Sequence, residues 1–315
     1  MIIALPPPAP PSPSLLTPAD LALLARLVPA TNPGSRSSGR GLFRAARPGR
    51  SHSFYDHRPY SPGDSPAEID WKAWGRSDRL LVRRGHRETD QAVQLVIDAS
   101  ASMGFTGFDR PQRRAAAAPR RRSTFHVAAR LALGLAWVHL RHTGPVGLSF
   151  AGGQTTRDLK PAKPPTHLAR LADALSQARP AGEANLAETL DRLASQQKKL
   201  GRVILLSDLH EPAPPLLSAL ARLRGRGVGT EVVHLTHHAV LKLPAFDEAV
   251  LVDLETGRRK RTDLASLRPG LTRRAQSAEQ AWRRILAARQ IAYFTALTSD
   301  PPAEVWRRIL TGSRG

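Results

Sequence analysis

The chain has 315 residues, and its hydrophobic fraction of 41% is enough for one large or two modest folded domains. It carries 47 Lys and Arg against 26 Asp and Glu, a net charge of +21 that favours anionic partners such as acidic proteins, nucleic acid or lipid headgroups. Because it contains no cysteine, disulfides, thiolate catalysis and sulfur-ligated zinc or iron are excluded.

The first 41 residues are expected to form a leader, a short helix and a linker. Residues 6–13 are too rich in proline for a helix or a central strand. Thr17 is a candidate N-cap before Pro18, and residues 30–41 are rich in Gly, Ser, Asn and Arg. The proline-broken start does not resemble a signal peptide, and the longest apolar window, 131–140, is shorter than the ~20 residues of a spanning helix. We therefore expect a cytoplasmic protein without a membrane span.

Residues 42–88 are expected to form a small β-rich or irregular subdomain, because short segments alternate with proline- and glycine-containing turns. This segment brings charged residues close to aromatic residues along the chain: Arg58, Tyr60, Asp64, Glu68, Asp70, Trp71, Lys72, Arg79, Arg83 and Glu88. These residues are interpreted either as an internal network of ion pairs and stacked rings that holds the segment against the main domain, or as a functional surface.

Residues 89–315 are predicted to form one α/β domain with a doubly wound, mostly parallel sheet, because strand-like and helix-like segments alternate. Strands are expected at 93–97, 146–150, 202–206, 229–235, 249–254 and 291–295, with a short partner strand around Leu159. Helices are expected at 124–141, 167–178, 186–200, 212–224, 277–288 and 301–310.

The segment 92–104 contains the clearest functional pattern of the chain. It reads as a strand buried on both faces that ends in Asp98, followed by Ser100 and Ser102 at alternate positions. A second buried strand ends in Asp208. Because ligands bind at the carboxyl ends of parallel strands, we expect these four side chains to share one edge and to bind a hard cation such as Mg²⁺. Alternatively, Asp98 caps a turn and the serines satisfy backbone groups.

These motifs resemble two known families. The pattern IDASASMG, followed by a helix and then LLSDLHEP, resembles a von Willebrand factor A type (vWA) domain with its metal-ion-dependent adhesion site. The upstream stretch FYDHRPYSPGDSPAEIDWKAWGRSDRLLVRR is similar to the signature of the bacterial family called domain of unknown function 58. The resemblance covers roughly residues 40–210 and implies a vWA-like, Rossmann-like fold. It also implies frequent association with MoxR-type AAA+ ATPases, and thereby a role in assembly or maturation of other proteins.

The resemblance implies a role for each ligand of the site. Asp98 would hold the cation mainly through water, Ser100 and Ser102 would bind it directly, and Asp208 would act from the adjacent strand. The family pattern also has a threonine before the third helix, where this chain has Ala184. The oxygen that this threonine would supply must then come from the neighbouring Glu183 or Asn185, or from water. Otherwise the site has lost its affinity for metal.

Two further groups of residues are candidates for a role beside this site. The arginine-rich residues 113–122 are either a solvated insertion or a basic edge that attracts an acidic partner. His237 and His238 are expected to be a surface pair, and His210 lies two residues after Asp208.

The leading hypothesis is a non-enzymatic module that binds a protein partner, which can be an AAA+ ATPase, through a magnesium-assisted surface. One alternative is a basic nucleic-acid-associated protein, whose binding would depend steeply on salt. A second alternative is a metal-dependent hydrolase that uses Asp98, Asp208 and His210.

Overall fold

The computed structural model describes most of the predicted α/β domain and part of the segment before it. The described residues are 15–27, 53–61, 69–86, 92–107, 123–154, 156–197, 199–211, 213–241, 248–252, 254 and 257–312. The proline-rich residues 6–13, the linker at 30–41 and the basic segment 113–122 lie outside them, so the predictions for these segments stay predictions.

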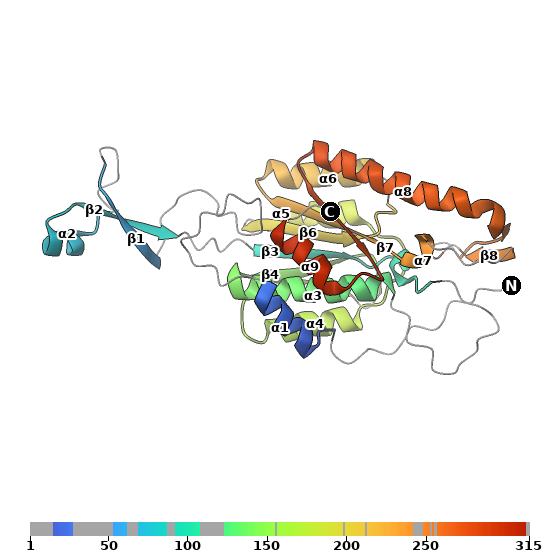
Figure 1. Cartoon of the computed structure of the whole chain (residues 1–315), viewed down its shortest axis with the longest axis horizontal. Helices are drawn as coiled ribbons and strands as arrows, with labels where there is room; N and C mark the ends of the chain where they lie inside the picture. Colours follow the sequence, from blue (N-terminus) through green and yellow to red (C-terminus); the bar gives the residue numbers. More distant parts are fainter. Residues whose placement is uncertain are drawn as a thin grey trace.

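A six-stranded sheet forms the centre of the molecule (Figure 1). Its strand order is β10-β7-β6-β3-β4-β5, and all neighbours are parallel except the edge pair of β4 and β5. The strands are β3 (Ala92–Asp98), β4 (Val146–Ala151), β5 (Leu159–Ala162), β6 (Leu200–Ser207), β7 (Gly229–Thr236) and β10 (Ala292–Leu297). The predicted α/β class with a mostly parallel sheet is confirmed.

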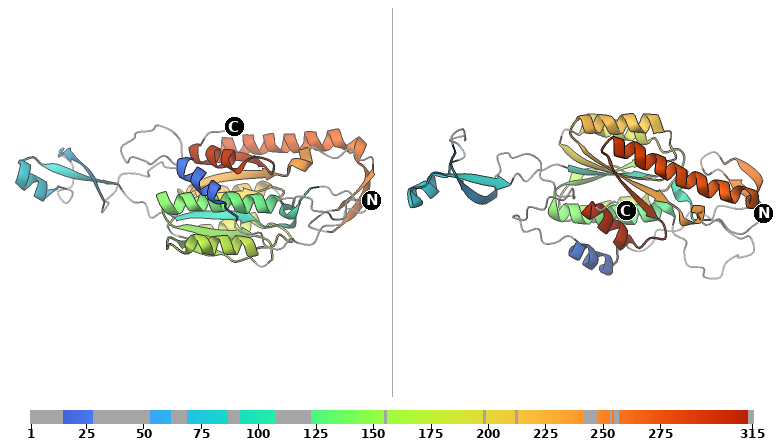
Figure 2. Two further views of the ribbon diagram at one scale, coloured as in Figure 1. Left: turned by 60° about the horizontal axis from the view of Figure 1, so that its bottom comes forward. Right: turned by 45° about the horizontal axis from the view of Figure 1, so that its top comes forward.

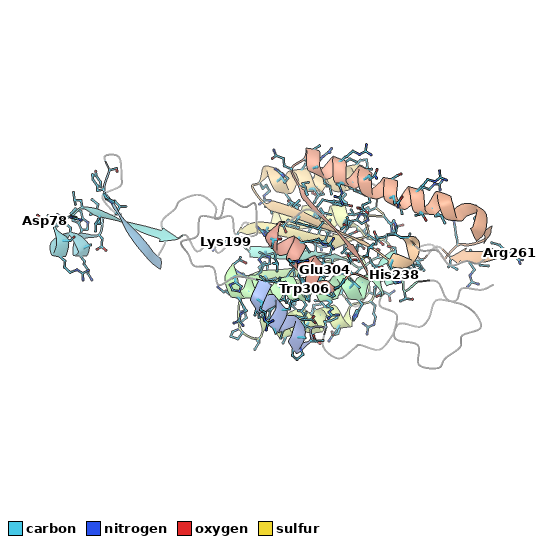
Figure 3. All side chains as sticks on the ribbon, in the orientation of Figure 1. Asp78, Lys199, His238, Arg261, Glu304 and Trp306 are labelled. Carbon is cyan, nitrogen blue, oxygen red and sulfur yellow. The ribbon has the colours of Figure 1, made fainter. Side chains whose placement is uncertain are left out.

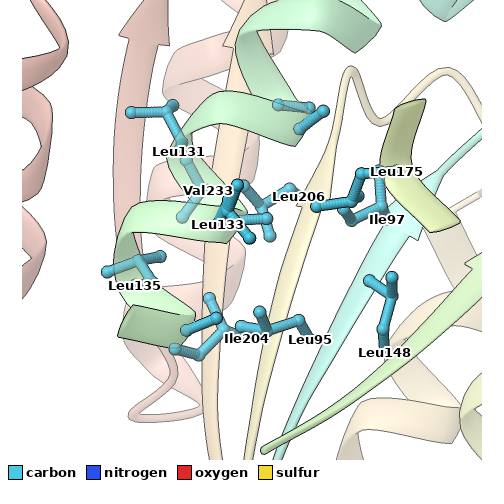
Figure 4. Packing of buried hydrophobic residues seen from close by; sticks show 14 of the residues in the cluster. Leu95, Ile97, Leu131, Leu133, Leu135, Leu148, Leu175, Ile204, Leu206 and Val233 are labelled. Atoms are coloured by element: carbon cyan, nitrogen blue, oxygen red, sulfur yellow. The ribbon is translucent and has the colours of Figure 1, made fainter. Parts of the chain in front are cut away.

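Helices cover both faces of this sheet (Figure 2). One face packs against α1 (Pro18–Leu27), α3 (Thr124–His142), α4 (His167–Gln177) and α9 (Pro302–Thr311). The other packs against α5 (Leu186–Gln196), α6 (Ala213–Gly225) and α8 (Leu264–Ala288). Leu95 and Ile97 of β3 point into the first core, shown in Figure 4, whereas Val96 points into the second. The continuous apolar run of β3 is therefore explained by burial on both faces.

The helix α1 is held against the main domain by a reciprocal cap and an ion pair. The Asp20 backbone N–H donates to the Thr17 hydroxyl, and the Thr17 N–H donates to the Asp20 carboxylate. The same carboxylate accepts two hydrogen bonds from the Arg130 guanidinium of α3, at 2.9 and 2.8 Å. Burial opposes ionisation of Asp20, but these hydrogen bonds lower its pKa below the ordinary value. The predicted N-cap at Thr17 is confirmed.

A smaller unit consists of β1 (Ser53–Pro59), α2 (Trp71–Ser77) and β2 (Leu81–His86) and lies apart from the sheet in Figure 1. The two strands pair antiparallel. A helix at α2 was not expected in a segment predicted to be β-rich or irregular. It forms because Asp70 caps its start, accepting from the backbone N–H of Lys72 and Ala73 at 3.1 Å each.

The elements after β7 differ most from the sequence prediction. The long helix α8 begins at Leu264, well before the predicted start at 277, although Pro269 and Gly270 lie within its first turns. A short helix, α7 (His238–Leu241), and a strand, β9 (Arg259–Asp263), were not predicted. The strand β9 pairs with β8 (Glu248–Val252), so the expected short strand at 249–254 belongs to a hairpin outside the main sheet. Within the described residues, no helix is both long and apolar enough to span a bilayer.

Candidate metal-binding site

The strands β3 and β6 are direct neighbours, and this pairing brings the predicted site together. Ile97 is paired with Leu206 in parallel register, so Asp98 and Ser207 end the two strands side by side. The loop after β3 begins with Ala99 and continues into a short 3₁₀ helix, Ala101–Gly104. The loop after β6 begins with Asp208. Both loops leave the carboxyl-terminal edge of the sheet, where the sequence placed the site.

Both carboxylate oxygens of Asp98 accept hydrogen bonds from serines. Its Oδ1 accepts from the backbone N–H and the hydroxyl of Ser100, at 2.9 and 2.6 Å. Its Oδ2 accepts from the Ser207 hydroxyl at 2.5 Å, and Ser207 in turn accepts from the Leu209 N–H at 2.8 Å. Asp98 is therefore fully engaged with its neighbours. Such a carboxylate orients hydroxyl groups and contacts a cation best through another group.

Asp208 has one carboxylate oxygen engaged and one oxygen left over. Its Oδ2 lies 3.0 Å from Nδ1 of His210. Its Oδ1 is buried and has no hydrogen-bond partner among the described residues. The Asp208 side chain is only 9% exposed, whereas His210 is 71% exposed. A buried acceptor without a partner is costly, because water no longer solvates it.

The hydroxyls of Ser100 and Ser102 form a short hydrogen-bonded chain that ends on Asp98. Their oxygens lie 3.0 Å apart. Because the Ser100 proton is donated to Asp98, Ser102 is the donor to the Ser100 oxygen. Each hydroxyl oxygen accepts at most one of these bonds, so each keeps a lone pair for a cation.

The two aspartates influence each other's ionisation. Burial, followed by the nearby negative charge of Asp208, raises the pKa of Asp98 to about 6, although bonds from Ser100 and Ser207 act in the opposite direction. Burial also opposes ionisation of Asp208, but the His210 hydrogen bond and charge, together with Ser102, lower the pKa of Asp208 below its ordinary value. At neutral pH the site therefore holds closely spaced negative charge.

This donor set fits a hard cation. Mg²⁺ prefers oxygen ligands, and the site offers lone pairs of the Ser100 and Ser102 hydroxyls. It also offers the Oδ1 of Asp208, which has no partner among the described residues, and Asp98 adds negative charge behind these groups. Among the described residues there is no group of three or more His, Asp or Glu that could hold a metal. A cation at this edge would consequently depend on the serine hydroxyls and on water.

The loop before α5 closes one side of the site but lacks the family's threonine. Ala181 N–H donates to the Ala99 carbonyl at 2.9 Å, and Ala101 N–H donates to the Gly182 carbonyl at 2.9 Å. The loop therefore lies directly beside the residues after β3. Ala184 is buried and offers no side-chain oxygen, while Glu183 and Asn185 are exposed. An oxygen from either of these two remains a prediction.

Glu211 is a residue of this region that the sequence analysis did not identify. Its carboxylate accepts from the backbone N–H of Leu186 at 2.7 Å, at the start of α5. Asn185 occupies the N-cap position in the left-handed conformation and makes no side-chain cap. Glu211 therefore satisfies a helix N-terminus from another loop. The available signal was an acidic residue three positions after Asp208.

The remaining histidines near this edge have local partners. The expectation of a surface pair at His237 and His238 is wrong for His237, which is buried and packs against Phe105 with ring centroids 4.8 Å apart. The His238 ring stacks on His237, and its Nδ1 lies 2.8 Å from the Thr298 hydroxyl. His234 is buried with its Nδ1 2.6 Å from the Tyr293 hydroxyl.

Comparison with known proteins places the chain in a family. Residues 56–281 match the family model described as "Protein of unknown function DUF58". No curated protein sequence matches the chain. Among solved structures, the conserved hypothetical protein BatB from Bacteroides thetaiotaomicron is 14% identical with a TM-score of 0.43, and the match covers 70% of this chain and 97% of that one.

A von Willebrand factor type A protein from Catenulispora acidiphila is also similar, with 15% identity, a TM-score of 0.36, and coverage of 75% of this chain and 44% of that one. The family match spans well over half of the 315 residues and includes Asp98, Ser100, Ser102 and Asp208. The chain therefore belongs to the DUF58 family, as its sequence motifs predicted.

Proposed function

We propose that this protein is a non-enzymatic interaction module that binds a protein partner through a magnesium-type cation at the edge formed by β3 and β6. The observation that carries the proposal is the Oδ1 of Asp208, buried and without a hydrogen-bond partner in the described part of the chain, beside two oriented serine hydroxyls. A bound cation would give that oxygen its missing partner.

Each residue has a distinct role in this proposal. Ser100, Ser102 and Asp208 would bind the cation directly, and Asp98 would hold the Ser100 hydroxyl in place and balance the positive charge. Ser207 would fix the second oxygen of Asp98, which it already contacts. The cation would supply an open coordination position that accepts a carboxylate oxygen from the partner. With Ala184 in place of the family's threonine, water would fill one position, so we expect modest affinity for Mg²⁺.

We further propose that the partner is an AAA+ ATPase of the MoxR type and that the module assists assembly or maturation of other proteins. The support is the family membership and the association that the family resemblance implies. A carboxylate on the partner surface would complete the cation site, which makes partner binding dependent on both metal and Asp208.

The proposal is tested with Asp208→Asn and a matched control, Asp191→Asn, which makes the same chemical change at an exposed ion pair with Arg222. Calorimetric titration with MgCl₂ should give saturable binding for the wild type and for Asp191→Asn, and none for Asp208→Asn. Pull-down of a MoxR-type ATPase from the same genome should be lost with Asp208→Asn or with chelator. Equal Mg²⁺ binding by both variants would contradict the metal site, and capture unaffected by either treatment would contradict its role in partner binding.

A second candidate function is phosphate-backbone binding, because one surface is strongly basic. Arg273, Arg274 and Arg284 are exposed along α8, and Arg259 and Lys260 are exposed on β9, which leads directly into it. The half-exposed Glu279 of α8 is paired with Arg283 at 3.2 Å. Cationic side chains attract nucleic-acid phosphates, and their binding releases the counterions that had been condensed on the nucleic acid.

This candidate predicts that a 24-base-pair DNA duplex binds with an affinity that falls steeply between about 50 and 200 mM salt. The double change Arg274→Gln and Arg284→Gln should weaken binding and reduce the salt slope by roughly two units, while Asp208→Asn should have no effect. Binding that is insensitive to salt, or unchanged by the double substitution, would exclude this surface as a nucleic-acid site.

A further inference from the structure

The exposed large hydrophobic side chains of the described residues gather in one small part of the molecule. Trp71 is 57% exposed, Trp74 44% and Leu80 42%, and all three belong to the unit formed by β1, α2 and β2. Such side chains normally contribute to a core, and an exposed group of them marks an interaction surface. The exposure of Trp71 agrees with the functional surface, one of the two interpretations of this segment, whereas Asp64, Glu68 and Glu88 of the expected network lie outside the described residues.

The two tryptophans are held in a fixed arrangement by their helix. They are three residues apart on α2, so they share one face, and their rings meet edge to face with centroids 6.1 Å apart. Asp70 caps the start of this helix, and Ala73 is buried beneath it. At its end, Asp78 adopts the left-handed conformation and its N–H donates to the Trp74 carbonyl.

The chain then turns back so that Leu80 is anchored beside β1. The Leu80 carbonyl accepts from the Tyr60 N–H at 2.9 Å, and the Leu81 carbonyl accepts from the Asp70 N–H at 2.8 Å. These bonds tie both ends of the segment 70–81 to a common backbone frame. A binding partner would therefore meet aromatic side chains that lose little conformational entropy on binding.

Exposed positively charged residues alternate with these apolar residues along the chain. Lys72, Arg76 and Arg79 are exposed, and Asp78 is the exposed acidic residue of the described segment 69–80. The side chain of Arg76 is directed back along α2, where its Nε donates to the Lys72 carbonyl at 3.2 Å. Figure 3 shows Asp78 at the end of the molecule opposite Arg261, so this unit presents its charges separately from the basic surface of α8.

We propose that Trp71, Trp74 and Leu80, with their rim of Lys72, Arg76 and Arg79, form a docking surface for an acidic protein segment that carries apolar anchor residues. Trp and Arg are the residues that dominate the binding energy of protein interfaces. The cationic rim complements a partner with Asp and Glu around its anchors. A second copy of this chain is disfavoured, because each copy has a net charge of +21.

The experiment uses the full chain and two labelled 18-residue helical peptides, which share the same leucine face and carry either glutamate or lysine at every polar position. Fluorescence anisotropy should show saturable binding of the glutamate peptide and much weaker binding of the lysine peptide. The double substitution Trp71→Ala and Trp74→Ala should weaken the affinity for the glutamate peptide by about tenfold or more. The pair Lys72→Glu and Arg79→Glu should reverse the preference between the peptides.

The matched control for charge is Arg170→Glu with Arg226→Glu, two exposed arginines, on α4 and directly after α6, that make the same change in net charge. This control should leave the preference for the glutamate peptide in place. Equal binding of both peptides, no effect of the tryptophan substitutions, or the same loss in the control would overturn the proposal. So would binding confined to phosphatidylglycerol vesicles or to a thymidine 20-mer, which would assign the surface to lipid or to nucleic acid.

The result of this peptide-binding experiment can be told apart from the result of the test of the metal site. Asp208→Asn and chelator should leave binding of the glutamate peptide unchanged, because no residue of the docking surface is a proposed ligand. The charge-reversal pair also protects the test against misfolding, since both of its residues are exposed on the surface.

Discussion

At the scale of single residues, burial and the number of hydrogen bonds decide which polar atoms are available for chemistry. The four predicted ligand residues illustrate this, because Asp98 and Asp208 lie together yet differ in how many of their oxygens are satisfied. Within the described part of the chain, the oxygen without a hydrogen-bond partner belongs to Asp208, which makes that residue the better target for mutation. His139 is a second example, outside the site.

His139 of α3 is fully buried as a neutral ring. Burial, assisted by the positive charges of Arg202 and His142, lowers the pKa of His139 to about 3. Its Nδ1 lies 2.8 Å from the Thr143 hydroxyl, and that hydroxyl donates to the His139 carbonyl, so the ring is best placed to donate from Nδ1. Its Nε2 is buried without a hydrogen-bond partner among the described residues.

This burial predicts an acid-sensitive stability. Between the ordinary pKa of 6.5 and the folded value of about 3, the unfolded state binds a proton at His139 that the folded state does not bind. The contribution of His139 to the free energy of unfolding should therefore fall as pH falls below 6.5, by up to about 1.4 kcal/mol per pH unit. Urea unfolding of wild type and His139→Gln between pH 4.5 and 7.5 measures it. A stability difference between the two proteins that does not change with pH would contradict the prediction.

At the scale of elements, close contact between helices α3 and α9 depends on a missing side chain. Trp306 of α9 is fully buried, and its indole N–H donates to the Leu131 carbonyl of α3 at 3.0 Å. A Cβ added at Gly134 would lie 2.4 Å from the Trp306 ring. The glycine in the middle of α3 is thus explained by the close approach of the Trp306 ring, despite the low helix propensity of glycine.

Gly134→Ala should therefore destabilise the protein by about 1–3 kcal/mol, because overpacking outweighs the roughly 1 kcal/mol that alanine contributes to a helix. The control is Gly75→Ala on α2, where nothing lies within 4 Å of the added Cβ and where we expect no loss of stability. Chemical unfolding of the two variants measures the difference. A Gly134→Ala protein as stable as the wild type would show that α9 can shift away at little cost.

Elements whose boundaries depend on local signals were predicted well, and others were not. The strands β3 and β6 and the helices α3 and α9 lie close to their predicted ranges, because their apolar patterns match the burial they experience. The start of α8 was missed because a proline and a glycine near its beginning imitate a helix boundary. The helix α2 was missed because its apolar residues are exposed and give no periodic core face.

At the scale of the whole molecule, the net charge of +21 acts on stability as well as on partner choice. Like charges repel in the compact state, and the exposed ion pair of Arg192 with Asp158, at 3.1 Å, contributes little against that repulsion. Added salt screens repulsion between exposed charges over distances of about 10 Å at 0.1 M.

We therefore expect the melting temperature, measured in chelator, to rise as NaCl increases from about 20 to 500 mM. The double variant Arg274→Gln and Arg284→Gln should melt higher at low salt and respond less to added salt. Differential scanning calorimetry makes the comparison, and a melting temperature that falls with salt would show that attractive ion pairs outweigh the repulsion.

The sequence by itself determined the fold class, the family and the identity of the four candidate ligand residues, because apolar periodicity and strand-terminal Asp and Ser are local features. Only the tertiary structure decided which oxygen of the site has no hydrogen-bond partner among the described residues, how Glu211 caps α5, and that Trp71 and Trp74 face solvent. These properties depend on contacts between residues far apart in the chain, or on the lack of such contacts. Burial and hydrogen bonding at one residue are set by neighbours that the sequence does not place beside it.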